Sequence, residues 1–396
     1  MKFEIFHQLG WNYNWNVDSY QNDKVGDGII FAPKYMVRTT VENFTNDVKS
    51  SSIFDPQFFN PHEINERMRT YGFYPESLMP EGYNTDKFSN FSSICIEKCM
   101  NFQSTNDFRF FIIPTIYYKD APPVEKFTDF QEKHFIKPSF ETATNLKAKK
   151  GMILQLVLNS HMIKDSDYSN YLLNWITGLE GLNGIYLIVE PSSGLKQIND
   201  PDYLYSILKF VDAAVQNKLI TILGYLNTEA ILLSLADPHV ITIGSHENLR
   251  IFNHLHFENY EEEPGIKQKT PWVFIPSMLD WIDFRLIQLL LKRSPEFKKY
   301  LGENKYSLEM LKPTYNPNSV KNRYYHYFLE GSKQLREISQ LEGKERFVKV
   351  YNLIHVAIEE RARIMRSTGV PFPGEGYLNQ WLIAANSFAS EKGWRE

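Results

Sequence analysis

Seven or eight apolar stretches, each ending in a few polar residues, restrict the possible folds of this chain more than any other feature. They cover residues 27–36, 52–59, 109–118, 152–159, 184–191, 219–227, 240–244 and 271–276. Most of them are separated by enough chain for a helix. Near-continuous apolar strands that alternate with helices are typical of parallel strands buried on both faces. Eight such units over about 250 residues predict an α/β fold, a (β/α)₈ barrel, whose chemistry lies at the C-terminal ends of the strands.

The remaining segments predict how the chain is divided. Residues 1–26 are rich in Asn, Trp and Tyr, and we expect an N-terminal extension that covers one end of a barrel built from residues 27–299. Long insertions at 60–107 and 119–150 favour βα loops that form lids or substrate walls. Residues 300–396 carry apolar side chains at a helical period, so we expect a helical C-terminal segment packed on the barrel.

Composition limits the partners and the compartment. The formal net charge of −4 gives no general attraction to nucleic acid, although a local basic face is compatible with it. Cys95 and Cys99, the two cysteines, are expected to be reduced thiols rather than a disulfide or part of a metal site. The chain has no apolar run long enough for a signal or a membrane span. We therefore expect a cytoplasmic protein with no membrane contact, no metal and no cofactor.

The ends of the first predicted strands supply several candidate binding residues. Asp55 can accept two N–H groups from a heterocycle while Gln57 offers a donor and an acceptor, or Asp55 caps the next segment. Asn159 follows the fourth strand. Glu190 follows five apolar residues, so partial desolvation would raise its pKa and suit a general acid or base; the alternative is a salt-bridged residue on the rim.

Later strand ends carry the densest group of polar residues. Asn227 follows the sixth strand and either binds a ligand or caps the next helix. The seventh strand leads into four polar residues that offer a base, an acid, an amide and a guanidinium: His246, Glu247, Asn248 and Arg250. They form either a functional cluster or a solvated loop. Asp280 follows the eighth strand, where it is a third candidate catalytic carboxylate beside Glu247 and Glu190, or part of a capping box with Ser277.

A family resemblance is carried by five segments in the second half of the chain: 184–190, 223–234, 239–250, 325–335 and 351–361. In them, from about residue 184 to 366, the chain resembles the tRNA-guanine transglycosylase superfamily. The resemblance implies a (β/α)₈ barrel that exchanges guanine for a 7-deazaguanine base. Glu190 stands in the place of the family's base-binding glutamine, Asp55 and Gln57 in those of a base-recognising aspartate and a nearby glutamine, and His326 in that of a zinc ligand.

Two departures from the family pattern change what the resemblance implies. The three clustered zinc cysteines have no counterpart, since residues 300–325 contain no cysteine, so His326 is expected to be structural. The nucleophilic aspartate falls near Ile241, Thr242 or Ile243, none of which can form a glycosyl ester. Glu247, Asp237 or Asp280 would have to replace it.

The main functional hypothesis is a base-modifying enzyme that acts on a purine-type base in DNA or RNA. Asp55 and Glu190 would bind the edge of the heterocycle, Arg250 would bind a phosphate or carboxylate, and Glu247 would be the preferred nucleophile or general acid. Such an enzyme would flip its target base and stack it on tyrosines.

Two alternatives belong to other classes of protein. A non-catalytic barrel in a multi-protein assembly would use the aromatic segment from Trp11 to Trp15 as a contact surface. A glycoside hydrolase would pair Glu190 with Asp280 or Glu247, with the carboxyl groups about 5–10 Å apart.

Overall fold

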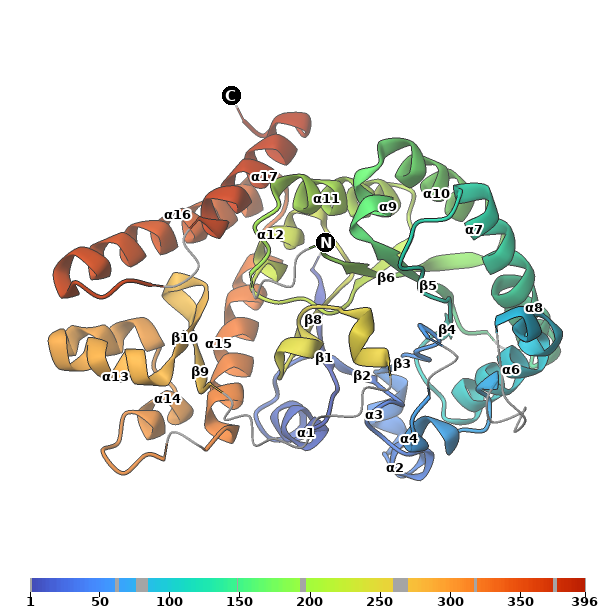
Figure 1. The fold of residues 1–396 in the computed structure, drawn as a ribbon, viewed down its shortest axis with the longest axis horizontal. Coiled ribbons are helices and arrows are strands. Elements are labelled where there is room, and N and C mark those ends of the chain that lie inside the picture. The colour runs from blue at the N-terminus through green and yellow to red at the C-terminus, as the bar shows by residue number, and fades with distance from the viewer. Residues whose placement is uncertain are drawn as a thin grey trace.

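The computed structural model describes residues 2–60, 64–75, 85–147, 149–192, 197–258, 270–316, 319–372 and 376–395. Its centre is a nearly closed barrel of eight parallel strands surrounded by helices, as the apolar stretches predict (Figure 1). The strands are ordered β3-β2-β1-β8-β7-β6-β5-β4 around the sheet. The Arg109 backbone N–H donates to the Ser52 carbonyl at 3.0 Å, which links the segments entering β4 and β3. The fold is therefore a (β/α)₈ barrel.

The barrel strands are short at the start of the chain and longest in its middle. They are β1 (Glu4–Gln8), β2 (Gly28–Phe31), β3 (Ile53–Phe54), β4 (Phe111–Ile113), β5 (Met152–Asn159), β6 (Leu182–Glu190), β7 (Ile220–Leu223) and β8 (Val240–Gly244). The structure corrects two expectations about them. The first strand lies within residues 1–26, which we expected to be an extension over one barrel end, and residues 271–276 do not form a barrel strand.

Both corrections have a physical reason. β1 contains His7 and Gln8 among its five residues, so it lacks the continuous apolar run that marks its neighbours. Residues 271–276 contain β9 (Trp272–Ile275), which pairs antiparallel with β10 (Asp280–Asp283) in a separate hairpin. This hairpin is packed on both faces, with Val273 in one hydrophobic cluster and Phe274 in another. Its sequence therefore looks like a buried parallel strand.

Helices occupy most of the connections around the barrel. They are α1 (Tyr13–Asn22), α2 (Arg38–Glu42), α3 (Asn46–Ser50), α4 (Glu66–Arg69), α6 (Thr85–Thr105), α7 (Val124–Gln131), the π-helical turn η1 (Glu132–Ile136), α8 (Lys137–Asn145), α9 (Ser160–Lys164), α10 (Ser166–Gly178), α11 (Pro201–Gln216), α12 (Ala230–Leu233) and the 3₁₀ turn η2 (Ser234–Ala236). The insertion at 119–150 thus forms helices, as does the described part of the insertion at 60–107. Residues 61–63 and 76–84 of the latter lie outside the described residues.

The C-terminal part is helical, as expected, and lies beside the barrel (Figure 1). It follows the 3₁₀ turns η3 (Glu247–Leu249), η4 (His254–Phe257) and η5 (Pro276–Met278), and comprises α13 (Phe284–Arg293), η6 (Pro295–Leu301), α14 (Lys305–Met310), α15 (Lys321–Ser339), α16 (Gly343–Thr368) and α17 (Tyr377–Glu391). The helix α17 packs against α11 of the barrel and against α16. None of the described helices combines the length and the apolar character that a membrane-spanning helix needs.

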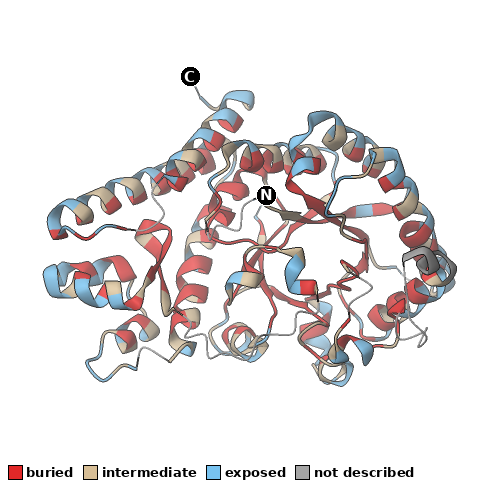
Figure 2. Cartoon of the chain, in the orientation of Figure 1, coloured by how far each residue is buried: buried red, intermediate tan, exposed pale blue. Residues whose placement is uncertain are grey.

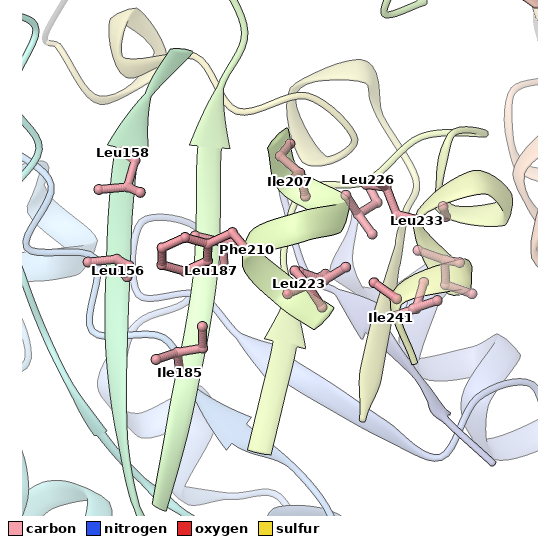
Figure 3. Close-up of a cluster of buried hydrophobic side chains, with 14 of the residues drawn as sticks. Leu156, Leu158, Ile185, Leu187, Ile207, Phe210, Leu223, Leu226, Leu233 and Ile241 are labelled. Atoms are coloured by element: carbon pink, nitrogen blue, oxygen red, sulfur yellow. The ribbon is translucent and has the colours of Figure 1, made fainter. Parts of the chain in front are cut away.

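Alternation along the strands separates two layers of core. Leu156 of β5 and Leu187 of β6 face outward and pack with residues of α11 such as Phe210 (Figure 3). The neighbouring residues Val157 and Tyr186 belong to the cluster inside the barrel. Both rows are buried (Figure 2). Because successive side chains in a strand alternate between faces, polar residues in the inner row are enclosed by the barrel.

Candidate functional site

The predicted site residues do not form one ring at the barrel mouth: some fall into three groups and the rest are dispersed. One lies inside the barrel, one borders a cleft at the C-terminal ends of the strands, and one lies against the β9–β10 hairpin. Each is built by different elements, so we describe them in turn.

The first group, the interior network, is a set of hydrogen-bonded polar side chains enclosed by the strands. Asp55, directly after β3, accepts a hydrogen bond from the Gln57 backbone N–H at 3.0 Å and one from Gln155 Nε2 of β5 at 2.6 Å. The Tyr186 hydroxyl of β6 lies 3.4 Å from Asp55 Oδ2 and 3.2 Å from Gln8 Oε1. The predicted pair Asp55 and Gln57 is thus brought together, but with strand residues rather than at an open surface.

Burial sets the protonation of Asp55. The side chain is 0% exposed, and desolvation raises its pKa to about 7, against the opposing effect of hydrogen bonds from Gln155, Gln57 and Tyr186. In the same network Gln57 Nε2 donates to the hydroxyl of Tyr225 at 3.2 Å. Among the described residues, Gln8 Nε2 and Gln155 Oε1 have no hydrogen-bond partner. The interior network is therefore almost, but not fully, satisfied by the chain itself.

The second group, the mouth cleft, is a cleft of about 400 Å³ beyond the ends of β3 and β4. Its walls are largely aromatic: Phe59, Ile116, Tyr117, Tyr118, His254 and Phe257. Asn60, Lys119, Asp120 and Glu258 add polar groups. A concave, mainly apolar cleft with a few polar groups is the usual form of a small-molecule site, and the C-terminal end is the usual place for it in a barrel.

Glu190, the last residue of β6, is held at the edge of this cleft. Its Oε1 accepts a hydrogen bond from the His254 backbone N–H at 2.9 Å and lies 2.8 Å from His254 Nδ1. Its Oε2 accepts a hydrogen bond from the Tyr117 hydroxyl, and the Tyr117 and His254 rings stack with centroids 5.1 Å apart. The Glu190 side chain is 13% exposed and that of His254 is 19% exposed. The predicted rim carboxylate is therefore part of a carboxylate–imidazole pair.

The second nitrogen of His254, Nε2, is shielded from solvent and has no hydrogen-bond partner in the described part of the chain. Glu258 Oε1 lies 3.8 Å from it. A shielded polar atom left without a partner costs about 1–3 kcal/mol. A ligand or water atom that met this nitrogen would offset that cost.

Neighbouring residues fix the cleft walls. Asn159 at the end of β5 donates from Nδ2 to the carbonyls of Tyr118 and Lys119, both at 3.1 Å, and its Oδ1 caps α9. Lys34 donates from Nζ to the His256 carbonyl, and its ammonium lies 4.9 Å from the centre of the Phe257 ring. The predicted ligand-binding residue Asn159 thus positions the backbone of one wall.

The third group, the hairpin group, brings Asn227 and Arg250 together through Trp281. The Trp281 indole N–H donates to Asn227 Oδ1 at 3.0 Å, and the Arg250 guanidinium lies 3.6 Å from the centre of the Trp281 ring. Arg250 is buried, which lowers its pKa, and its Nε and Nη1 have no hydrogen-bond partner in the described residues. Glu229 is buried nearby, and desolvation raises its pKa to about 7. Arg250 therefore joins the barrel to the hairpin rather than lying open at the mouth.

The other predicted residues are dispersed. Asp280 begins β10 and forms a buried ion pair with Arg361 of α16, and that contact points to a structural role. His246 Nε2 lies 2.8 Å from Asn12 Nδ2, and its Nδ1 lies 3.1 Å from the Tyr324 hydroxyl oxygen. Asn248 donates to Tyr35, and Glu247 is exposed in η3. The expected cluster after β8 is thus divided among several contacts.

The three residues near which the resemblance would place a nucleophile lie on β8, with only Thr242 on its inner face. Thr242 is buried between Ile241 and Ile243, which face the outer core, and its Oγ1 lies 3.4 Å from the Leu226 backbone N–H. His326 is buried and its Nε2 lies 2.9 Å from the Phe274 carbonyl, so it has structural contacts.

Sequence comparison adds no assignment to this geometry. No protein-family model matches the chain, and no curated protein matches it in sequence. In the described residues, no group of three or more His, Cys, Asp or Glu side chains is arranged to hold a metal ion. The resemblance to the transglycosylases stays a prediction.

Sequence reasoning missed His254 and the role of Tyr117. His254 lies ten residues beyond β8, past the polar cluster on which the prediction concentrated. The remaining signal was the presence of three histidines, at 246, 254 and 256, in one connection. Tyr117 lies at the end of the predicted stretch 109–118, but the sequence does not match it to Glu190, 73 residues away.

Proposed function

We propose that the protein is an enzyme in which Glu190 and His254 act as a general-base pair on a small ligand bound in the mouth cleft. One observation carries the proposal: Glu190 binds His254 through Nδ1, while Nε2 has no hydrogen-bond partner among the described residues. His254 also lines the cleft.

The chemistry follows from the two nitrogens of the imidazole. With its proton on Nδ1 and directed to Glu190, the neutral ring keeps a lone pair on Nε2. Nε2 is shielded from solvent in this structure, so a movement of the His254 ring or of a neighbouring side chain would first have to expose it to the cleft. It could then accept a proton from a hydroxyl, a water molecule or a ring N–H. Glu190 then stabilises the imidazolium, and Tyr117 holds Glu190 in place through its second oxygen.

Base exchange on a purine-type base is the narrower form of this proposal, and it follows from the resemblance. Exchange with retention at the sugar needs a carboxylate that bonds to the sugar carbon. With Thr242 on the inner face of β8, Glu190, Asp120 and Glu258 are the carboxylates at the cleft that could supply it. Contact with DNA or RNA belongs to this narrower form.

The test compares turnover by three single variants. Purified protein is incubated with a metabolite and nucleoside extract, and products are followed by mass spectrometry. The wild type and the control His161→Gln, which changes an exposed histidine in the first turn of α9, should convert the same compound. Glu190→Gln and His254→Gln should lose at least about 100-fold of that rate, the usual contribution of a general base.

Two results would oppose the proposal. Equal turnover by all four proteins would remove Glu190 and His254 from the chemistry, and no turnover by any of them would favour the non-catalytic barrel. Folding of each variant is checked by circular dichroism. Exchange of labelled guanine into RNA or DNA, lost in His254→Gln, would support the narrower form.

A further inference from the structure

The mouth cleft combines aromatic walls with carboxylates. Phe59, Tyr117, Tyr118 and Phe257 supply the rings, and Asp120 and Glu258 lie in the lining. Glu190 lies next to Tyr117 and accepts a hydrogen bond from its hydroxyl. Aromatic faces carry negative partial charge and attract cations, most strongly where water is excluded.

Glu258, Glu190 and Asp120 lie close to the wall formed by Tyr117 and His254. Glu258 Oε1 lies 3.8 Å from His254 Nε2. Burial raises the pKa of Tyr117 well above its usual value, and the negative charges of Glu190 and then Asp120 raise it further. Three acidic groups are therefore close to the Tyr117–His254 wall.

Among the described residues, two lysines lie near the cleft, Lys119 and Lys34. Lys119 and Asp120 are both exposed in the lining, where solvent screens their opposite charges, whereas Glu258 is only partly exposed. The Lys34 ammonium donates to the His256 carbonyl and lies over Phe257. An ammonium of the chain itself thus occupies the face of one cleft ring, which is the contact that a cationic ligand would make with the others.

We propose that the mouth cleft binds an organic cation, a flat or compact amine or amidine whose charge is placed among the aromatic rings and the carboxylates of Asp120 and Glu258. The proposal rests on the proposed function for the identity of the site but names the class of its ligand. Within it, Glu258 and Asp120 are specificity residues, and Glu190 and His254 are the reacting pair.

Three probes of nearly equal shape test this charge preference. Benzamidine is a cation, benzamide is neutral and benzoate is an anion, so their affinities differ mainly through charge. Binding of each to the full chain is measured by isothermal titration. We expect benzamidine to bind about tenfold more tightly than benzamide, the size of one favourable cation–π or charge contact, and benzoate to bind most weakly.

Variants assign the preference to the cleft. Glu258→Gln and Asp120→Asn should each weaken benzamidine about three- to tenfold while leaving benzamide unchanged. Glu141→Gln, which removes a carboxylate from a separate groove between α6 and α8, is the matched control and should bind as the wild type. Equal affinity for the three probes, or a benzamidine preference that persists in both cleft variants, would overturn the proposal.

The His254→Gln variant keeps the two proposals apart. It should lose turnover but retain the preference for benzamidine, because the walls and both specificity carboxylates remain. A charge preference without any turnover would support the ligand class and contradict the enzyme. Turnover that depends on His254, together with no preference for benzamidine, would support the enzyme and contradict the ligand class.

Discussion

The interior network around Asp55 and the residues around Glu190 at the mouth cleft place the same kinds of side chain in two different settings. Each carboxyl lies at the end of a strand and is bound by a tyrosine hydroxyl and other donors. Asp55 is fully enclosed, while Glu190 lies beside a cleft of about 400 Å³. Among the described residues, both groups contain buried polar atoms without a hydrogen-bond partner: Gln8 Nε2 and Gln155 Oε1 in the first, and His254 Nε2 in the second. The difference between the groups is therefore the cleft beside Glu190.

Aromatic rings lie between the two regions. Tyr225, which accepts a hydrogen bond from Gln57, contacts Phe252 with ring centroids 5.4 Å apart. Phe252 contacts Phe59 at 5.1 Å and Tyr117 at 5.7 Å. The comparison teaches that a polar group at a strand end becomes a candidate for chemistry only on the solvent side of such a layer.

The largest expected difference between the regions is in pH dependence. Because the folded pKa of Asp55, about 7, lies above its unfolded value, this group contributes stability at low pH that is lost as the pH rises toward 7. Asp55→Asn should therefore match the wild type near pH 4 and be more stable at pH 8, by up to about 4 kcal/mol. Urea unfolding at the two pH values measures this. An unchanged pH profile would mean that Asp55 is ionised in the folded protein.

A second prediction compares the removal of each carboxyl. Asp55→Ala leaves the Gln155 amide and the Gln57 N–H without an acceptor in a dry interior, so we expect a loss of about 3 kcal/mol at pH 5. Glu190→Ala should cost about 1 kcal/mol, because its partners border the cleft and can reach water. Denaturant unfolding of both variants measures the ratio. Equal losses would contradict the separation into a sealed and an open region.

The smallest effect is expected from a pair of tyrosine hydroxyls. Tyr186→Phe removes the group shared by Asp55 and Gln8 and should cost about 1.5 kcal/mol. Tyr117→Phe should cost less than about 1 kcal/mol, since Glu190 keeps two contacts to His254. Thermal unfolding is the measurement, with circular dichroism to confirm the fold. A larger loss of stability for Tyr117→Phe than for Tyr186→Phe would mean that the contacts of Glu190 at the mouth cleft contribute more to barrel stability than the interior network does.

Much of the barrel follows from local pattern. The predicted stretches 152–159 and 240–244 coincide with β5 and β8, because both faces of these strands are buried and their apolar runs are continuous. The strand prediction failed where the burial of a strand does not match its sequence pattern. β1 carries Gln8 inside the barrel and His7 on its outer side against Phe328 of α15, and β9 is buried on both faces without belonging to the barrel.

The candidate site was predictable only in part, for a related reason. Glu190 could be placed at a strand end, since the end of an apolar run is visible in the sequence. Arg250 was also singled out, but its position over Trp281 depends on a hairpin that begins more than twenty residues later. Contacts between distant segments leave no local pattern, so they could not be anticipated.

The sequence by itself determined the barrel, the strand ends and the set of polar residues near them, because apolar periodicity is a property of neighbouring residues. The tertiary structure decided which of those residues meet. The connection after β8 returns across the mouth and places His254 on Glu190, 64 residues away in the chain. Closure of the barrel also brings Tyr225, Phe252 and Phe59 from three different connections into contact. These rings form the aromatic layer between Asp55 and the cleft.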